Sequence, residues 1–214
     1  MWVINRMNNI STRVSNYKSS KKQELAFYSC NVWIRDKNQI VQEPVKVVKI
    51  SNHEEYHMFC DNYHISVVPE HIKRINRGSK MYALCESERL ISCGWVAYKE
   101  LFWIAEIDTV IDMSDSCTGV LYDFETSESF RGKGFYSVLL KYIMSDLIGI
   151  DEYLIYAKKE NRSSCRGIEK ANFTFDGYFK QNASEFIYYL EEKEIKILGH
   201  RYACGGLRYT RIMQ

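Results

Sequence analysis

The stretch from residue 119 to residue 149 most constrains how this chain can fold. Apolar side chains first alternate over residues 120–124, which is typical of a strand. After residues 131–134, which contain two glycines, apolar side chains recur at helical spacing over residues 138–147. Gly149 is placed as the C-terminal stop of that helix. The sequence therefore predicts a strand, a glycine-containing loop and a helix.

The loop has the composition of an anion site. Such a loop directs backbone N–H groups toward one point, beside the positive end of the helix dipole. Gly132 and Gly134 lack the Cβ atoms that would shield those donors, and Arg131 and Lys133 add positive charge. A turn with two solvated cations is the alternative. The P-loop is excluded because it needs Lys-Ser/Thr after four intervening residues, and the dinucleotide fingerprint because it needs three glycines.

The loop resembles the coenzyme A loop of the GNAT superfamily of N-acetyltransferases, written Arg/Gln-x-x-Gly-x-Gly/Ala. Arg131 and Gly134 match this pattern, and Tyr136 stands where a small residue is usual. The larger side chain of Tyr136 affects how tightly the end of the loop contacts the phosphate.

A second motif supports the resemblance. The family has Asn-x-x-Ser/Ala after its buried fifth strand, and this chain has Asn161 and Ser164 at that spacing after the apolar residues 153–157. The family pattern Tyr-x-Lys-x-Gly-Phe follows. Here Asn172 replaces the glycine, and Ile168 replaces the tyrosine that protonates the leaving thiolate in many members.

The resemblance implies an α/β fold with a central mixed, mostly antiparallel sheet of about six to seven strands, flanked by helices. Its fourth and fifth strands would splay apart, and acetyl-CoA, used as a co-substrate, would place its pantetheine arm in the gap. By resemblance, the residues that bind it are Phe124, Thr126, Arg131, Gly132, Lys133, Gly134, Phe135, Tyr136, Ser137, Asn161 and Ser164. Lys158 and Lys159 would either assist the phosphates or form a solvated loop.

A chain of 214 residues suits one catalytic domain with an extension. We expect residues 1–44 to form an N-terminal extension that packs on a GNAT-like domain at 45–214. The predicted order of elements follows the family from residue 45 to about residue 212. Predicted strands are 26–34, 45–50, 81–85, 90–98, 102–111, 118–126, 153–157, a strand from 178 onward, 186–190, 195–198 and 208–212; predicted helices besides the central one are 51–62, 69–75 and 163–171.

The segment after residue 50 contains two overlapping signals. Ser51 and Glu54 have the spacing of a capping box, which predicts the start of a helix. His53 and His57 also match the His-Glu-x-x-His pattern of zinc hydrolases. A zincin carries that motif in the middle of a buried helix with a third ligand, whereas here it lies in the first helical turn. We therefore favour an exposed helix start and expect no metal.

The composition of the chain limits the kinds of partner that we expect it to bind. A net charge of +2 with interspersed charges gives no basic face for nucleic acid, and the apolar runs are too short to cross a membrane. Seven scattered cysteines fit neither a disulfide framework nor a zinc ribbon, and nothing in the first residues marks export. We expect a cytoplasmic protein, either a monomer or a homodimer, whose partner is a small-molecule amine.

The expected chemistry is transfer of an acetyl group to a primary amine, which needs a base for the ammonium and stabilisation of the oxyanion. Asp123 is the first candidate for the base and Glu106 the second, although a structural ion pair is an equally open role for Asp123. For the acid, Tyr178 or Tyr136 would serve, or none. A coenzyme A-binding module that has lost catalysis stays open because of Ile168.

For the acceptor we favour a nucleotide-linked amino sugar of bacterial surface polysaccharide synthesis. The charge near neutrality argues against an acceptor steered by a large field, and tyrosine-rich strands, such as that with Tyr188 and Tyr189, suit a flat-faced sugar. A protein amine, a polyamine or a drug is the alternative.

Overall fold

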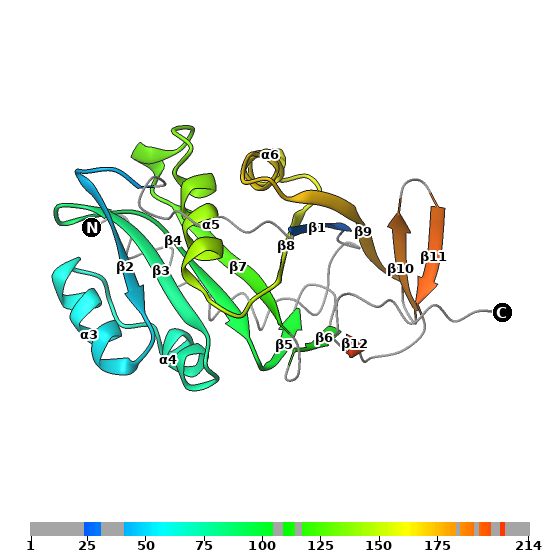
Figure 1. Cartoon of the computed structure of the whole chain (residues 1–214), viewed down its shortest axis with the longest axis horizontal. Coiled ribbons are helices and arrows are strands. Elements are labelled where there is room, and N and C mark those ends of the chain that lie inside the picture. The colour runs from blue at the N-terminus through cyan, green and yellow to red at the C-terminus, as the bar shows by residue number, and fades with distance from the viewer. Residues whose placement is uncertain are drawn as a thin grey trace.

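The structure is a computed structural model, which describes residues 24–30, 41–104, 109–113, 117–182, 185–190, 193–197 and 202–203. Figure 1 shows its elements along a strongly twisted sheet. Within these ranges the helices are α3 (His53–Asn62), α4 (Pro69–Asn76), the 3-10 helix η2 (Glu128–Phe130), α5 (Phe135–Asp146) and α6 (Arg162–Lys170). The strands are β1 (Glu24–Cys30), β2 (Val45–Ile50), β3 (Lys80–Glu86), β4 (Arg89–Tyr98), β5 (Leu101–Ile104), β6 (Thr109–Asp112), β7 (Thr118–Thr126), β8 (Glu152–Lys158), β9 (Thr174–Asn182), β10 (Glu185–Leu190), β11 (Lys193–Ile197) and β12 (Tyr202–Ala203).

The main sheet is mixed and mostly antiparallel, as expected. Within the described residues it has nine strands in the order β11-β10-β9-β1-β8-β7-β4-β3-β2, and only β7 and β8 pair in parallel. This exceeds the expected six to seven strands because β1 and the β10–β11 hairpin lengthen the sheet.

Two apolar clusters cover the two faces of the sheet. One joins α5 and α6 to side chains that include Leu121 and Ile155, and the other joins α3 and α4 to side chains that include Trp95. Figure 1 shows α5 and the α3–α4 pair on opposite sides of the β2-β3-β4-β7 strands. The strands carry apolar side chains on both faces because each face is covered by helices.

Strand β1 comes from the segment that was expected to be an extension. It pairs antiparallel with β8 on one side and with β9 on the other. Ala26 and Tyr28 on β1 are buried in the α5–α6 cluster. Residues 24–30 therefore form an inner strand of the sheet. The rest of the expected extension, apart from residues 41–44, lies outside the described residues, as do residues 31–34 of the predicted first strand.

Two predicted boundaries need correction. The N-cap of α3 is Asn52, whose side chain accepts from the N–H of Glu55, while the Glu55 carboxylate accepts from the N–H of Ser51 at 2.6 Å. The capping box was thus placed one residue early at Ser51 and Glu54. The predicted single strand at 102–111 is instead two short strands, β5 and β6, which pair antiparallel with each other and form a second sheet with β12.

The strand, loop and helix predicted at residues 119–149 are present. Strand β7 has the predicted bounds, and α5 ends at Asp146 with Gly149 in a left-handed conformation three residues later. The last predicted strand, 208–212, and the turn at 205–206 lie outside the described residues.

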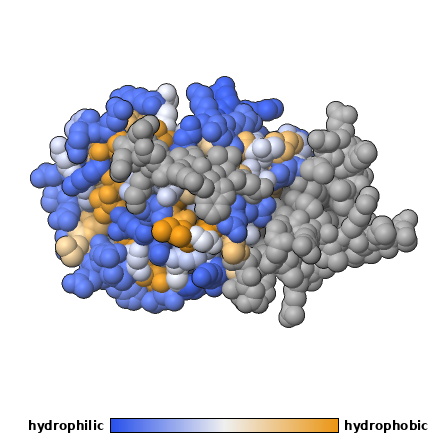
Figure 2. All heavy atoms as spheres, viewed as in Figure 1, coloured by the Kyte–Doolittle hydropathy of each residue, from blue (hydrophilic) through white to orange (hydrophobic). Residues whose placement is uncertain are grey.

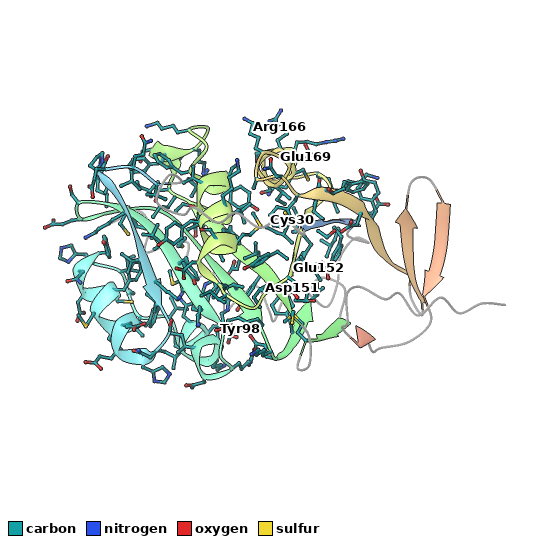
Figure 3. All side chains as sticks on the ribbon, in the orientation of Figure 1. Cys30, Tyr98, Asp151, Glu152, Arg166 and Glu169 are labelled. Atoms are coloured by element: carbon teal, nitrogen blue, oxygen red, sulfur yellow. The ribbon has the colours of Figure 1, made fainter. Side chains whose placement is uncertain are left out.

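The face of the molecule in Figure 2 is mainly hydrophilic over the described part, with apolar side chains in separate patches. Across the ranges that the structure describes, no helix is both long enough and apolar enough to span a membrane.

Candidate functional site

Strands β7 and β8 part at the centre of the sheet. Their parallel pairing ends with Leu121 opposite Ile155. Beyond that point β7 stays paired with β4 as far as Thr126, and β8 stays paired with β1 as far as Lys158. The facing edges of β7 and β8 therefore present backbone groups that do not pair with each other. This confirms the expected splay, which offers hydrogen bonds to an extended ligand.

A bulge lies on β7 directly beyond this point. The register between β4 and β7 shifts between Cys93 and Trp95, and Asp123 on β7 has a φ of 52°. Asp tolerates this left-handed conformation better than most residues. The ring of Phe124 crosses Gly94, where a Cβ would lie 2.2 Å from ring carbons. Only glycine at residue 94 leaves room for the ring, so the bulge and Gly94 fix the position of Phe124.

The glycine loop begins where β7 ends. Gly132 and Gly134 have φ values of 78° and 85°, which glycine adopts without steric cost. The first backbone hydrogen bond of α5 runs from the N–H of Val138 to the carbonyl of Gly134. The N–H groups of residues 132–137 donate to no backbone acceptor within the described part of the chain. These donors lie together at the start of α5, which is the arrangement that binds anions.

The loop is held from beneath by an aromatic side chain. Phe130 packs into the α5–α6 cluster, and its ring lies 5.9 Å from that of Phe135. The ammonium of Lys133 is 5.2 Å from the Phe130 ring centroid. Arg131 donates from Nε to the carbonyl of Thr126 at 3.1 Å. Both cations are exposed, so they remain beside the free N–H groups while they hold the loop in place.

Other predicted cofactor residues have structural partners. The hydroxyl of Ser137 is buried and donates to the carbonyl of Gly167 at 2.8 Å, which ties α5 to α6. Asn161 caps α6: its side-chain oxygen accepts from the N–H of Ser164 at 3.2 Å and from the hydroxyl of Ser163 at 2.8 Å. The contacts expected with coenzyme A would thus fall to the backbone of Ser137 and to the amide nitrogen of Asn161.

The two tyrosines proposed as acids lie in different surroundings. Tyr136 packs its ring 5.3 Å from that of Phe124 and against Gly167, where a Cβ would be 2.4 Å from the ring. Burial raises the pKa of Tyr136, and Cys165 adds to the rise. Tyr178 lies on β9 with the ammonium of Lys159 4.3 Å from its ring centroid. Tyr136 thus contacts Phe124, which was predicted to bind the cofactor, and Tyr178 contacts Lys159, which was considered for the phosphates.

The second candidate for the base, Glu106, lies outside the described residues. The first, Asp123, forms an ion pair with Arg74 of α4, with 2.5 Å between Nη1 and Oδ2. Arg74 also lies 5.2 Å from the ring centroids of both Trp95 and Tyr122. The side chain of Arg74 is 14% exposed and that of Asp123 41% exposed. The structure therefore shows the ion pair that was left open as the alternative role for Asp123.

Sequence reasoning missed the polar side chains under α4. Helix α4 buries His71 and Ile75, and Arg74 falls on the same stripe. The signal was a histidine and an arginine at positions i and i+3 on the apolar face of a short helix. Burial and, to a smaller extent, the charge of Arg74 lower the pKa of His71 to about 4, while Asp123 opposes this shift. Tyr56 completes this cluster: its hydroxyl shares a hydrogen bond with Nδ1 of His71 at 2.8 Å.

The His-Glu-x-x-His segment lies at the exposed start of α3. His53 and His57 are exposed in the first turns of α3. Among the residues described, no group of three or more histidine, cysteine or acidic side chains is placed to hold a metal ion.

Known proteins resemble this chain in structure. No family model matches it, and no curated protein matches it. A solved protein assigned to the GNAT acetyltransferase family from Novosphingobium aromaticivorans aligns with a TM-score of 0.50 and 11% identity, over 74% of this chain and 62% of that protein. A GNAT-family acetyltransferase from Colwellia psychrerythraea aligns with a TM-score of 0.44 and 15% identity, over 80% of this chain and 59% of that protein. The first likeness shows that the fold is GNAT-like. This chain spans less than two thirds of the length of either solved protein.

Proposed function

We propose that this protein is an N-acetyltransferase that moves an acetyl group from acetyl-CoA to a primary amine. The observation that carries the proposal is the junction of two features: the gap between β7 and β8 leads directly into the loop whose N–H groups at residues 132–137 are free. A ligand with an extended amide-containing arm and a pyrophosphate matches this junction, and coenzyme A has both parts. The GNAT-like fold supports the proposal by analogy only.

The chain's own residues have distinct tasks in this proposal. The N–H groups of the loop hold the pyrophosphate, with Arg131 and Lys133 beside them. The free edges of β7 and β8 orient the pantetheine arm. The thioester then lies near the bulge, so that its carbonyl and the amine meet in a fixed geometry. The acetyl group, when bound, supplies the electrophile.

The acceptor is, on this proposal, a nucleotide-linked amino sugar of bacterial surface polysaccharide synthesis. The aromatic side chains on the α4 face of the bulge support this choice. The ring of Tyr122 lies 4.7 Å from that of Phe102 and 6.5 Å from that of Trp95. Trp95 and Phe102 are buried, so the half-buried Tyr122 is the ring of this group that would meet the flat face of a sugar or a base. A peptide amine or a polyamine is the competing acceptor.

The experiment has two parts. Calorimetry with coenzyme A tests the site, and thiol release from acetyl-CoA with amino-sugar nucleotides, peptides and polyamines tests the reaction. We expect binding, together with turnover of an amino-sugar nucleotide. Turnover of peptides alone would overturn the sugar and leave the acetyltransferase. Binding without any turnover would favour the non-catalytic coenzyme A module, for which the buried Ile168 in the place of the family's tyrosine is the supporting observation.

The same scheme assigns the protein to the cytoplasm. Five of the six cysteines within the described ranges are buried, at positions 30, 60, 85, 93 and 165. Buried thiols of this kind act as small apolar side chains and suit a reducing compartment.

A further inference from the structure

A directed chain of hydrogen bonds runs beneath the end of α4. The hydroxyl of Tyr122 on β7 donates to Oγ of Ser79 at 3.0 Å. The hydroxyl of Ser79, in the connection between α4 and β3, donates to Oε1 of Glu100 at 2.6 Å. Glu100 lies in the turn between β4 and β5. Both protons point the same way, toward the carboxylate.

The chain begins at the place where the sheet opens. Tyr122 is the first residue of β7 beyond Leu121, the last residue paired with β8. The bulge at Asp123 follows immediately. The Tyr122 side chain is half-buried, whereas Ser79 is 3% exposed. The chain therefore leads from the opening, through a buried hydroxyl, to the partly exposed Glu100.

We propose that Tyr122, Ser79 and Glu100 form a proton relay that deprotonates the acceptor amine, an inference that rests on the proposed N-acetyltransferase function. Tyr122 donates its own proton to Ser79, so its oxygen keeps lone pairs that accept a hydrogen bond from a substrate ammonium. Tyr122 contacts the substrate as a catalytic residue. Ser79 and Glu100 act through it.

The proton transfer balances without a further reactant. An N–H bond of the ammonium breaks and its proton binds the Tyr122 oxygen. The phenolic proton passes to Ser79, and the Ser79 proton passes to the Glu100 carboxylate. The amine nitrogen keeps the electron pair and attacks the thioester carbonyl. Glu100 ends as a neutral acid and returns its proton to solvent.

The charged groups around these three residues favour proton transfer from Tyr122 toward Glu100. Burial raises the pKa of Glu100, while the hydrogen bond from Ser79 and the charge of Arg77 at the end of α4 lower it. The pKa of Tyr122 is raised to about 12, chiefly by burial; Arg74 and the hydrogen bond with Ser79 oppose the rise, and Glu100 and Asp123 add to it. Tyr122 therefore stays protonated and passes a proton on, whereas Glu100 is the group that ionises.

Asp123 is less suited to the same task. Its carboxylate is paired with Arg74, whose guanidinium is held by the rings of Trp95 and Tyr122. Taking a proton from the substrate would break that pair and leave a cation in a largely buried place, which is costly. Glu100 accepts from a hydroxyl, and the cation whose charge acts on it, Arg77, is exposed, so protonation of Glu100 leaves no buried charge unpaired.

Steady-state kinetics from pH 5 to pH 9 test the relay, with the amino-sugar nucleotide or other amine that turns over in the panel. Glu100→Gln keeps the size of the side chain and an oxygen that accepts from Ser79. We expect kcat to fall by about a hundredfold, within the usual range for loss of general base catalysis, and the acid limb of the profile to disappear. Tyr122→Phe and Ser79→Ala should each cause a similar loss, and neither should add to that of Glu100→Gln, because the three act as a unit.

Matched controls are Glu88→Gln, Tyr142→Phe and Ser145→Ala, which change the same groups in the β3–β4 turn and on α5. They should leave kcat within about twofold. Glu100→Asp keeps a carboxylate and should keep an acid limb at reduced kcat. Calorimetric affinity for coenzyme A should be unchanged in every variant, which shows that the fold is intact.

A second readout does not depend on turnover. In infrared difference spectra against Glu100→Gln, the Glu100 carboxyl should titrate above the ordinary value of about 4.3 for glutamate. It should move further up in Ser79→Ala, because a hydrogen bond that favours the carboxylate is lost. Turnover with an unchanged acid limb in Glu100→Gln would overturn the relay while the acetyltransferase stands. A wild-type protein that binds coenzyme A and acetylates no amine would overturn the function itself, and the relay with it.

Discussion

The guanidinium of Arg74 on α4 lies 2.5 Å from the carboxylate of Asp123 at the bulge of β7. This contact joins a short helix to the strand where the sheet opens. Arg74 is mostly buried and Asp123 is partly exposed. The pair therefore fixes the bulge from one side, while the ring of Phe124 fixes it from the other.

Asp123→Asn is expected to destabilise the protein by about 1–3 kcal/mol, less than for a fully buried pair because Asp123 is 41% exposed. Urea unfolding measures this. The control is Glu70→Gln, which removes the exposed Lys73–Glu70 pair on the same helix and should cost no more than about 0.5 kcal/mol. Kinetics of Asp123→Asn also distinguish the two candidates for the catalytic base, Asp123 and Glu100. If Asp123→Asn lowers kcat and flattens the acid limb, as first expected for a base, Asp123 takes the proton and Glu100 does not.

Gly134→Asp is expected to weaken coenzyme A binding at least tenfold, about 1.4 kcal/mol. The new carboxylate would stand among the free N–H groups of the loop and repel the pyrophosphate. The control is Gly149→Asp, because Gly149 has a φ of 82°, close to the 85° of Gly134, and both have open space around a Cβ. Calorimetry should show wild-type affinity for the control. Equal affinities of all three proteins would show that the loop does not bind the cofactor.

Tyr136→Phe and Tyr178→Phe test the source of the acid. Tyr136 packs on Phe124 and Gly167, and Tyr178 packs on Lys159, so the rings can keep their contacts without the hydroxyl. We expect kcat to fall by less than about threefold in both variants, because the thiol of coenzyme A is acidic enough to leave without full protonation. A loss of a hundredfold in one of them would assign the acid to that tyrosine.

His71 makes folding stability depend on pH. Its pKa is about 4 in the folded protein against an ordinary 6.5, so the unfolded chain binds the extra proton between these values. Stability is therefore fully present above pH 6.5 and falls as the pH drops toward 4, by about 3 kcal/mol for this group. Urea unfolding at pH 7 and pH 4.5 measures the slope.

His71→Gln should flatten this slope, and His57→Gln, on the exposed side of α3, should not. If the pH dependence of stability persists in His71→Gln, other titrating groups cause it. Because Tyr56 shares a hydrogen bond with His71, the comparison is best made between the slopes rather than between the absolute stabilities.

Local pattern predicted the centre of the fold well. The change from alternating to helical spacing placed β7, the loop and α5, and the splay of β7 and β8 followed from the family resemblance. The division into β5 and β6 was missed because residues 105–108 alternate between apolar and polar, as in a continuous strand. At the start of α3, Ser51 and Asn52 are both good caps, and only the backbone decides between them.

The side chains of the candidate site were harder to predict. The contacts of Arg74, Tyr122, Ser79 and Glu100 join residues far apart in sequence, and a charge or hydroxyl has no periodicity of its own. Asp123 was identified as a polar residue at the opening, but its partner on α4 depends on tertiary packing. A strand was predicted at residues 26–34, of which 26–30 lie in β1, whereas the place of β1 between β8 and β9 was not predicted, because a pattern specifies a strand and not its neighbours.

The position of β1 sets an order of assembly. Residues 24–30 are synthesised early, yet their two partners are β8 and β9, more than a hundred residues later. Until residue 182 has been synthesised, β1 lacks one of its two partner strands, and the edge of β8 that pairs with β1 is open. Contacts of such long sequence separation slow folding, and an open edge exposes the growing chain to wrong pairing. The half of the sheet that contains β8, β1 and β9 would therefore form last, when β1 inserts between β8 and β9.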